Sequence, residues 1–177
     1  MSGRPTTLAQ IAERSKSIED FGRTLRDWLH ELRRVSSRPQ VAATMADPPC
    51  VLRNRFPGGA TADAWLAAYA EYLAERTDTV PPKWAFGPLR VSPEPWFADE
   101  SGNLALRLAA LRQAPLPFKR RNLYTLSVEL PLGLRAGRPA KSSDEKRRAN
   151  AERQRRFRAR RKAEFVSLRE RTALGDL

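Results

Sequence analysis

Half of the 20 residues between Lys146 and Phe165 are lysine or arginine. From Arg153 to Lys162, seven residues are basic and none is acidic. Charges placed this densely repel one another unless an anion lies nearby, so the segment cannot be buried in a hydrophobic core. The core must therefore come from the rest of the chain, and the basic segment itself indicates a polyanionic partner.

The charge of the whole chain is unevenly distributed. The 177 residues carry a net charge of +13. Residues 138–177 hold 14 lysines and arginines against 6 acids, a surplus of 8, whereas residues 1–137 hold 19 against 14, a surplus of 5. A surplus of this size predicts nucleic acid as the partner, with an anionic membrane surface as the weaker alternative.

The length allows one ordinary domain with an extension. We expect a mainly α-helical protein, with a small helical domain over residues 1–130 for partner binding or oligomerisation. A basic linker over residues 131–143 contains the run RAGRPAKSS, in which Gly, Pro and Ser sit among positive charges. A long arginine-rich helix is expected over residues 144–177.

Apolar residues recur with a helical period in the first domain. Ser17 is a typical N-cap residue, and the stripe that follows it predicts a helix to about Arg34. Further helices are expected over residues 8–14, 40–45, 61–76 and 103–113. Prolines and the Gly58-Gly59 pair predict a loop before residue 61. Residues 80–97 are rich in proline and aromatic residues, so we expect an extended segment that wraps the helices. Residues 122–128 are expected to be a short strand or irregular.

The sequence Ser142-Ser143-Asp144-Glu145 matches a helix capping box, so a helix is predicted from Asp144 to about Arg171. It would be roughly 40 Å long. Within it, residues 150–162 (NAERQRRFRARRK) resemble the basic region of leucine-zipper transcription factors, with an Asn, an aromatic residue seven positions on and an Arg eight positions on.

In that family the basic helix lies in the major groove of DNA. The resemblance implies that Asn150 and Arg158 read base edges, and that Phe157 touches a thymine methyl group or, on single-stranded RNA, stacks on a base. Contacts with phosphates would come from the other basic residues of the helix, namely Arg147, Arg148, Arg153, Arg155, Arg156, Arg160, Arg161 and Lys162.

The segment departs from the family because it lacks a zipper. After the basic residues only Phe165 and Leu168 keep an a/d-like spacing, so any homodimer must form elsewhere, and we expect it to form through the N-terminal domain. In the linker, Gly137-Arg138-Pro139 resembles part of an AT-hook, with Ala136 where the first Arg would stand. Arg138 would then enter a minor groove, and a plain flexible linker is the alternative.

The body of the chain carries a second resemblance, over roughly residues 7–125. It resembles a poorly described family of small bacterial helical proteins, some of which look like antitoxin or regulator components encoded beside nucleotidyltransferase-type toxins. The similarity implies an all-helical body and a toxin or other protein partner. It rests on the runs FGRTLRDWLHEL (21–32), WLAAYAEYLAER (65–76), VPPKW (80–84), EPWF (94–97) and FKRRN (118–122).

Other residues give weaker indications. Trp65, Tyr69, Tyr72, Trp84 and Trp96 are expected to form core, with a partner-binding surface as the alternative. His30 is expected on a helix surface. Cys50 is expected to be a small buried hydrophobe, because no second histidine could serve as its base.

No catalytic, cofactor-binding or metal-binding motif stands out, so an enzyme is not expected. The single cysteine fits a reducing cytoplasm, and no leader or membrane span is predicted. Together these observations predict a bacterial DNA-binding regulator, whose more specific form would be an antitoxin-like repressor. DNA is favoured over RNA as the ligand. The alternative is a protein-interaction module whose basic tail binds RNA or polyanions in general.

Overall fold

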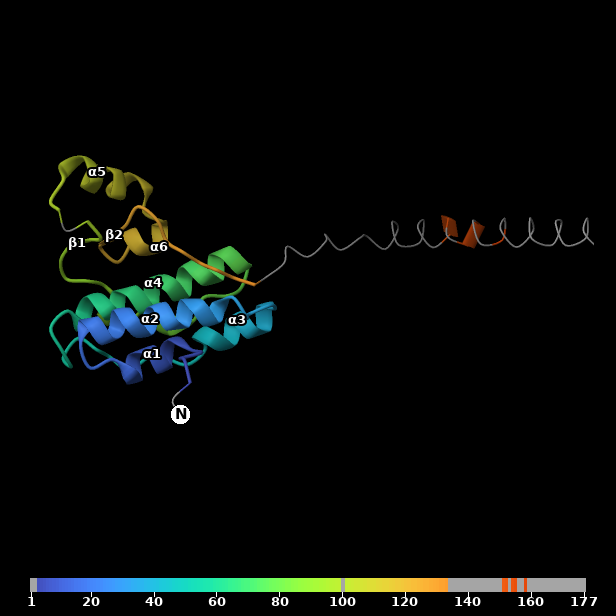
Figure 1. Cartoon of the computed structure of the whole chain (residues 1–177), viewed down its shortest axis with the longest axis horizontal. Coiled ribbons are helices and arrows are strands. Elements are labelled where there is room, and N and C mark those ends of the chain that lie inside the picture. The colour runs from blue at the N-terminus through green and yellow to red at the C-terminus, as the bar shows by residue number, and fades with distance from the viewer. Residues whose placement is uncertain (1–2, 100, 134–150, 153, 156–157, 159–177) are drawn as a thin grey trace, which may run out of the picture. The chain divides into compact units, whose positions relative to one another are not determined.

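The computed structural model describes residues 3–99 and 101–133, together with residues 151–152, 154–155 and 158. The chain divides into two units, Met1–Arg135 and Ala136–Leu177. The described residues are mainly α-helical, as predicted (Figure 1). The first unit contains α1 (Leu8–Arg14), α2 (Ile18–Leu32), α3 (Arg38–Met45), α4 (Gly59–Thr77), α5 (Leu104–Gln113) and α6 (Leu116–Lys119).

Two short 3-10 helices and two short strands complete the first unit. The 3-10 helices are η1 (Lys83–Phe86) and η2 (Pro88–Arg90), and the strands are β1 (Trp96–Phe97) and β2 (Leu123–Tyr124). The strands pair in parallel, with Trp96 opposite Leu123 and Phe97 opposite Tyr124. This small sheet ties the segment after η2 to the segment after α6.

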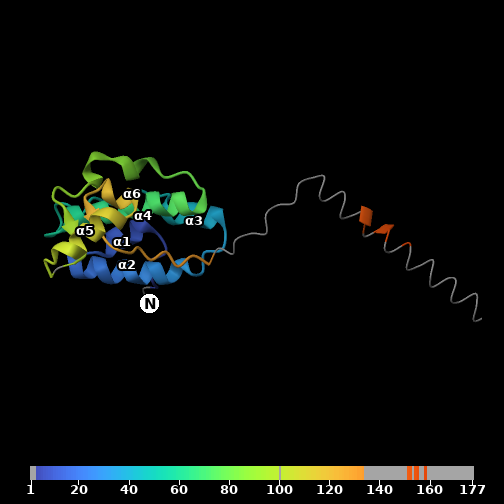
Figure 2. The same ribbon diagram turned by 90° about the horizontal axis from the view of Figure 1, so that it is seen from above.

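Helix α4 is the centre of the unit. Figure 2 shows it with α2 on one side and the segment of η1 and η2 on the other. Its alanines and leucines are buried around most of its circumference, as expected for a helix covered on several sides. It begins at Gly59, two residues before the predicted start. A Cβ atom on Gly59 would lie 2.0 Å from the Leu52 carbonyl oxygen, so the close approach of the two backbones requires glycine.

Helix α2 begins as its sequence predicts. The Oγ atom of Ser17 accepts a hydrogen bond from the backbone N–H of Asp20 at 3.2 Å. The helix buries Phe21, Trp28 and Leu32 and ends at Leu32, two residues earlier than predicted. Helix α1 has the predicted bounds. Helix α3 begins at Arg38 rather than Gln40, because proline is well tolerated in a first helical turn.

Residues 80–97 differ in part from the extended segment that was predicted. They form η1 and η2 before becoming extended at β1, and both 3-10 helices pack on α4. Helix α6 was not predicted, because it is only four residues long and prolines stand at its start. Its Phe118 is nevertheless fully buried, so this short helix contributes directly to the core.

The five aromatic residues that were predicted to form core, Trp65, Tyr69, Tyr72, Trp84 and Trp96, lie in or against it. Phe118 contacts Trp65, Tyr69 and Tyr72 edge-on, with ring centroids 5.3, 5.4 and 5.7 Å apart. Trp96 packs on Trp65, and the Trp84 indole N–H donates to the Met45 carbonyl. The aromatic cluster therefore joins α4, α6 and β1. It closes a body whose described residues form six α-helices, where five were expected.

Candidate functional site

Two of the twelve residues predicted to bind nucleic acid lie in the described part of the C-terminal unit. Arg155 and Arg158 are both helical and both exposed. Residues three positions apart share one face of a helix, so the two guanidinium groups can be offered together to one polyanionic backbone. The other ten lie outside the described residues: Arg138, Arg147, Arg148, Asn150, Arg153, Arg156, Phe157, Arg160, Arg161 and Lys162.

The first unit contains a buried ion pair between Asp63 of α4 and Arg90 of η2. The Asp63 carboxylate accepts hydrogen bonds from the Leu52 N–H at 3.0 and 3.1 Å, the Arg53 N–H at 2.9 Å and Arg90 at 2.7 Å. Arg90 also donates to the Pro49 carbonyl and lies over the Trp84 ring. These bonds hold the loop before α4 against η2.

Burial dominates the titration of this pair. It raises the pKa of Asp63 above its usual value, and the Leu52 N–H and Arg90 oppose that rise. Burial likewise lowers the pKa of Arg90, opposed by Asp63. The carboxylate oxygens are occupied by backbone and guanidinium donors, so the pair acts as a structural clamp.

A second cluster of charges lines a pocket of 340 Å³, which we call the arginine pocket. Its walls are Glu71, Ala85, Phe86, Gly87, Val91, Arg120 and Arg121. Both oxygens of the buried Glu71 carboxylate are bound, one by Arg120 and the other by Arg121, each at 2.5 Å. Arg121 also donates to the carbonyls of Pro117 and Ala85.

The arginine pocket has a net charge of +1, because two arginines share one carboxylate. The Arg120 side chain is 54% exposed, so part of its guanidinium faces solvent. Phe86 and Val91, also in the wall, are exposed apolar residues. The pocket can therefore accept an acidic group that stands beside an apolar one. No sequence pattern indicated this pocket, because Glu71 comes from α4 and its partners lie 49 and 50 residues later.

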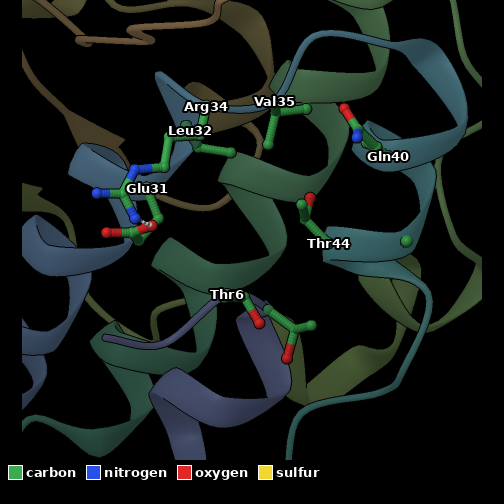
Figure 3. Close-up of a pocket in the computed structure, with 9 residues that line it drawn as sticks. Thr6, Glu31, Leu32, Arg34, Val35, Gln40 and Thr44 are labelled. Atoms are coloured by element: carbon green, nitrogen blue, oxygen red, sulfur yellow. Dashed lines mark hydrogen bonds and ion pairs between the residues drawn. The ribbon is translucent and has the colours of Figure 1, made fainter. Parts of the chain in front are cut away.

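A further hollow of 300 Å³ lies among α2, α3 and the residues before α1 (Figure 3). Glu31 at its edge binds Arg34 at 2.8 Å and Arg4 at 3.5 Å. On the opposite side, Gln40 accepts from the Ser36 N–H and Thr44 donates to the Val41 carbonyl. The polar groups that line this hollow thus have partners within the protein, and its floor is apolar.

Two residues that were considered for chemistry occupy surface positions. His30 borders a small pocket with Arg26, Arg33 and Glu129. Cys50 is exposed, with its sulfur 3.1 Å from the Arg55 guanidinium, so the expectation that it is buried was wrong. The buried position is taken by its neighbour Pro49, whose carbonyl accepts from Arg90.

The described ranges hold neither a cluster of metal ligands nor a helix that could span a membrane. Within residues 3–99 and 101–133 and the five described residues of the C-terminal unit, no three His, Cys, Asp or Glu side chains gather as a metal site would require. Among the helices described, none combines the length and apolar character needed to cross a bilayer.

Comparison with protein-family models, curated proteins and solved structures finds no match to this chain. The resemblances of the body and of the basic segment therefore stay predictions.

Proposed function

We propose that this protein is a DNA-binding regulator that acts in the cytoplasm and holds DNA through its basic C-terminal segment. The observation that carries the proposal is the partition of charge. The last 40 residues carry a surplus of 8 positive charges, and the two predicted contact residues that are described, Arg155 and Arg158, are helical and exposed. A segment of this charge suits a polyanion far better than a protein core.

Binding would be driven by the release of counterions from phosphates. If the segment neutralises about seven phosphates, affinity falls on the order of 10³ to 10⁴-fold between 50 and 200 mM salt. Phosphate contacts give affinity without sequence preference, whereas base contacts by Asn150 and Arg158 would supply the preference.

Single substitutions in the full chain separate these two roles. We expect Asn150→Ala and Arg158→Ala to relax the preference for the promoter duplex over a scrambled duplex, and Arg161→Ala to weaken both duplexes alike. Fluorescence anisotropy titrations with both duplexes measure the ratio. An equal loss on every sequence in all three variants would show that the segment reads no bases.

The body would bind a second protein, and the arginine pocket supports this part of the proposal. Its surplus charge and its exposed apolar wall, with Phe86 57% exposed, fit an acidic and partly apolar protein surface. In an antitoxin-like repressor that partner would be a toxin.

The alternative function is a protein-interaction module whose basic segment binds RNA or polyanions in general. The same arginine pocket favours it, because the pocket needs no DNA for its role. Competition between a DNA duplex and an RNA hairpin of equal charge separates the two functions. Preferential displacement by the hairpin would favour the module, and preferential displacement by the duplex would favour the regulator.

A further inference from the structure

Helix α5 exposes four leucines, three of them along one face and the fourth, Leu106, on the opposite side. Leu104, Leu108 and Leu111 are spaced four and three residues apart, so they form a single stripe. They are 70%, 51% and 41% exposed. A soluble helix normally turns such a stripe toward the core, and a contiguous apolar patch on the surface marks an interaction site. We call these three residues the leucine face.

The contacts of α5 explain why the leucine face stays open. Figure 1 shows α5 at the edge of the first unit, beyond α6 and the two strands. The helix is held there by Ala110, its one buried residue, and by Arg107, whose guanidinium lies 5.1 Å from the centre of the Phe97 ring. Ala110 therefore lies away from the leucine face, whereas Arg107, three residues after Leu104 and four before Leu111, borders it.

The charges around α5 are polarised along the helix axis. Asp99 lies just before the helix, where its carboxylate accepts hydrogen bonds from the Ser101 N–H and hydroxyl. Within Leu104–Gln113 the charged residues are Arg107 and Arg112, with no acid among them. The N-terminal approach to the helix is thus acidic, whereas its C-terminal end carries the exposed Arg112.

We propose that the leucine face is a dimer interface, in which α5 packs antiparallel against α5 of a second copy of this chain. A two-fold axis near the middle of the helix brings Leu104 of each copy toward Leu111 of the other. The same axis brings the acidic approach of one helix to the basic end of its partner, twice. In a parallel arrangement, Arg112 of one copy would instead lie against Arg112 of the other and repel it. A strongly basic partner protein would likewise be repelled by both arginines of the helix.

The dimer stands on the leucine face and on the charges of α5, and it does not depend on nucleic-acid binding. If the proposed function also holds, each dimer carries two basic segments. Two basic segments suit two half-sites on one duplex. The contact between the two leucine faces would then hold the dimer together in place of the zipper that residues 165–177 lack.

The mass of the full chain in solution tests the interface. Sedimentation equilibrium should give about twice the 20.0 kDa of one chain. Leu108→Glu should raise the dimer dissociation constant about tenfold or more, because each dimer loses two buried leucines. Leu89→Glu is the matched control, since Leu89 lies in η2 and is 43% exposed. Circular dichroism should be unchanged in both variants.

Charge exchange tests the antiparallel arrangement. Asp99→Arg and Arg112→Glu should each weaken the dimer, and the double variant should recover most of the affinity, because the two charges then attract again with reversed signs. A monomer at every concentration, a dimer unaffected by Leu108→Glu, or a double variant weaker than either single variant would overturn the proposal. None of these readouts involves DNA, so failure here is separate from failure of the proposed function.

Discussion

Asp63 and Arg90 show how much of this fold depends on single buried charges. Asp63 is fully buried and Arg90 is 6% exposed, and together they hold the loop at Leu52 and Arg53 against α4 and η2. We expect Arg90→Met to lower the free energy of unfolding by about 3–5 kcal/mol, because it leaves a buried carboxylate without its counter-charge. Urea unfolding at pH 7 measures the loss.

The sign of the pH effect follows from the titration of Asp63. Arg90 opposes the rise in the pKa of Asp63, so its removal raises that pKa further. A protonated Asp63 is neutral and needs no counter-charge. The loss in free energy of unfolding caused by Arg90→Met should therefore become smaller as the pH falls. In the Asp63→Asn background the same substitution should cost less. A loss below about 1 kcal/mol for Arg90→Met alone would show that the clamp is dispensable.

Residue by residue, the sequence predicted apolar burial better than polar burial. Trp65, Tyr69 and Tyr72 follow a helical period, which indicated their place in the core. Glu71 lies among them and is also buried, whereas a charged residue in such a pattern is normally predicted to be exposed to solvent. Its burial depends on Arg120 and Arg121, which reach it only after the chain has folded back through α6.

At the scale of elements, the start of α2 offers the most direct test. Ser17 caps the helix through the Asp20 N–H, and hydrogen bonding to Ser17 lowers the pKa of the exposed Glu19. Ser17→Ala should cost about 0.5–2 kcal/mol of stability through the lost cap. Thermal unfolding measures the cost, and NMR titration should show the pKa of Glu19 moving up toward 4.5. Ser127, an exposed residue outside any helix, offers a matched Ser→Ala control.

The pH dependence of this cap has a defined direction. Because the folded pKa of Glu19 is lowered, its contribution to stability is present above its unfolded pKa and is lost as the pH falls through the folded value. Ser17→Ala removes much of that contribution. The free energies of unfolding of the original chain and of the variant should therefore differ more at neutral pH than at pH 3. A difference that grows on acidification would contradict the hydrogen bond to Glu19.

Helices with a strong apolar period could be predicted from the sequence. Elements too short to show a period could not. Periodicity and caps located α1, α2, α4 and α5 to within two residues. Helix α6 and the 3-10 helices were missed, because runs shorter than two turns show no period and prolines suggested extended chain. The sequence predicted α5 from the very leucines that the structure leaves exposed, since periodicity finds a helix without showing what covers it.

For the whole molecule, the sequence located the candidate nucleic-acid segment but not the features of the body. The density of arginine alone predicted the segment, and Arg155 and Arg158 are helical and exposed as that prediction requires. The arginine pocket and the leucine face each arise from residues brought together, or left uncovered, by tertiary packing. No local pattern could indicate either of them.

The central claim is that the basic C-terminal segment holds nucleic acid and reads DNA sequence. Fluorescence anisotropy at 150 mM salt should compare the full chain with residues 1–137 on the promoter duplex, a scrambled duplex and an RNA hairpin. The truncation removes 14 of the 33 lysines and arginines. We predict that the full chain prefers the promoter duplex, that the truncated chain loses this preference, and that affinity falls steeply with salt. Equal binding of the full chain to all three ligands, or a preference that survives truncation, would contradict the claim.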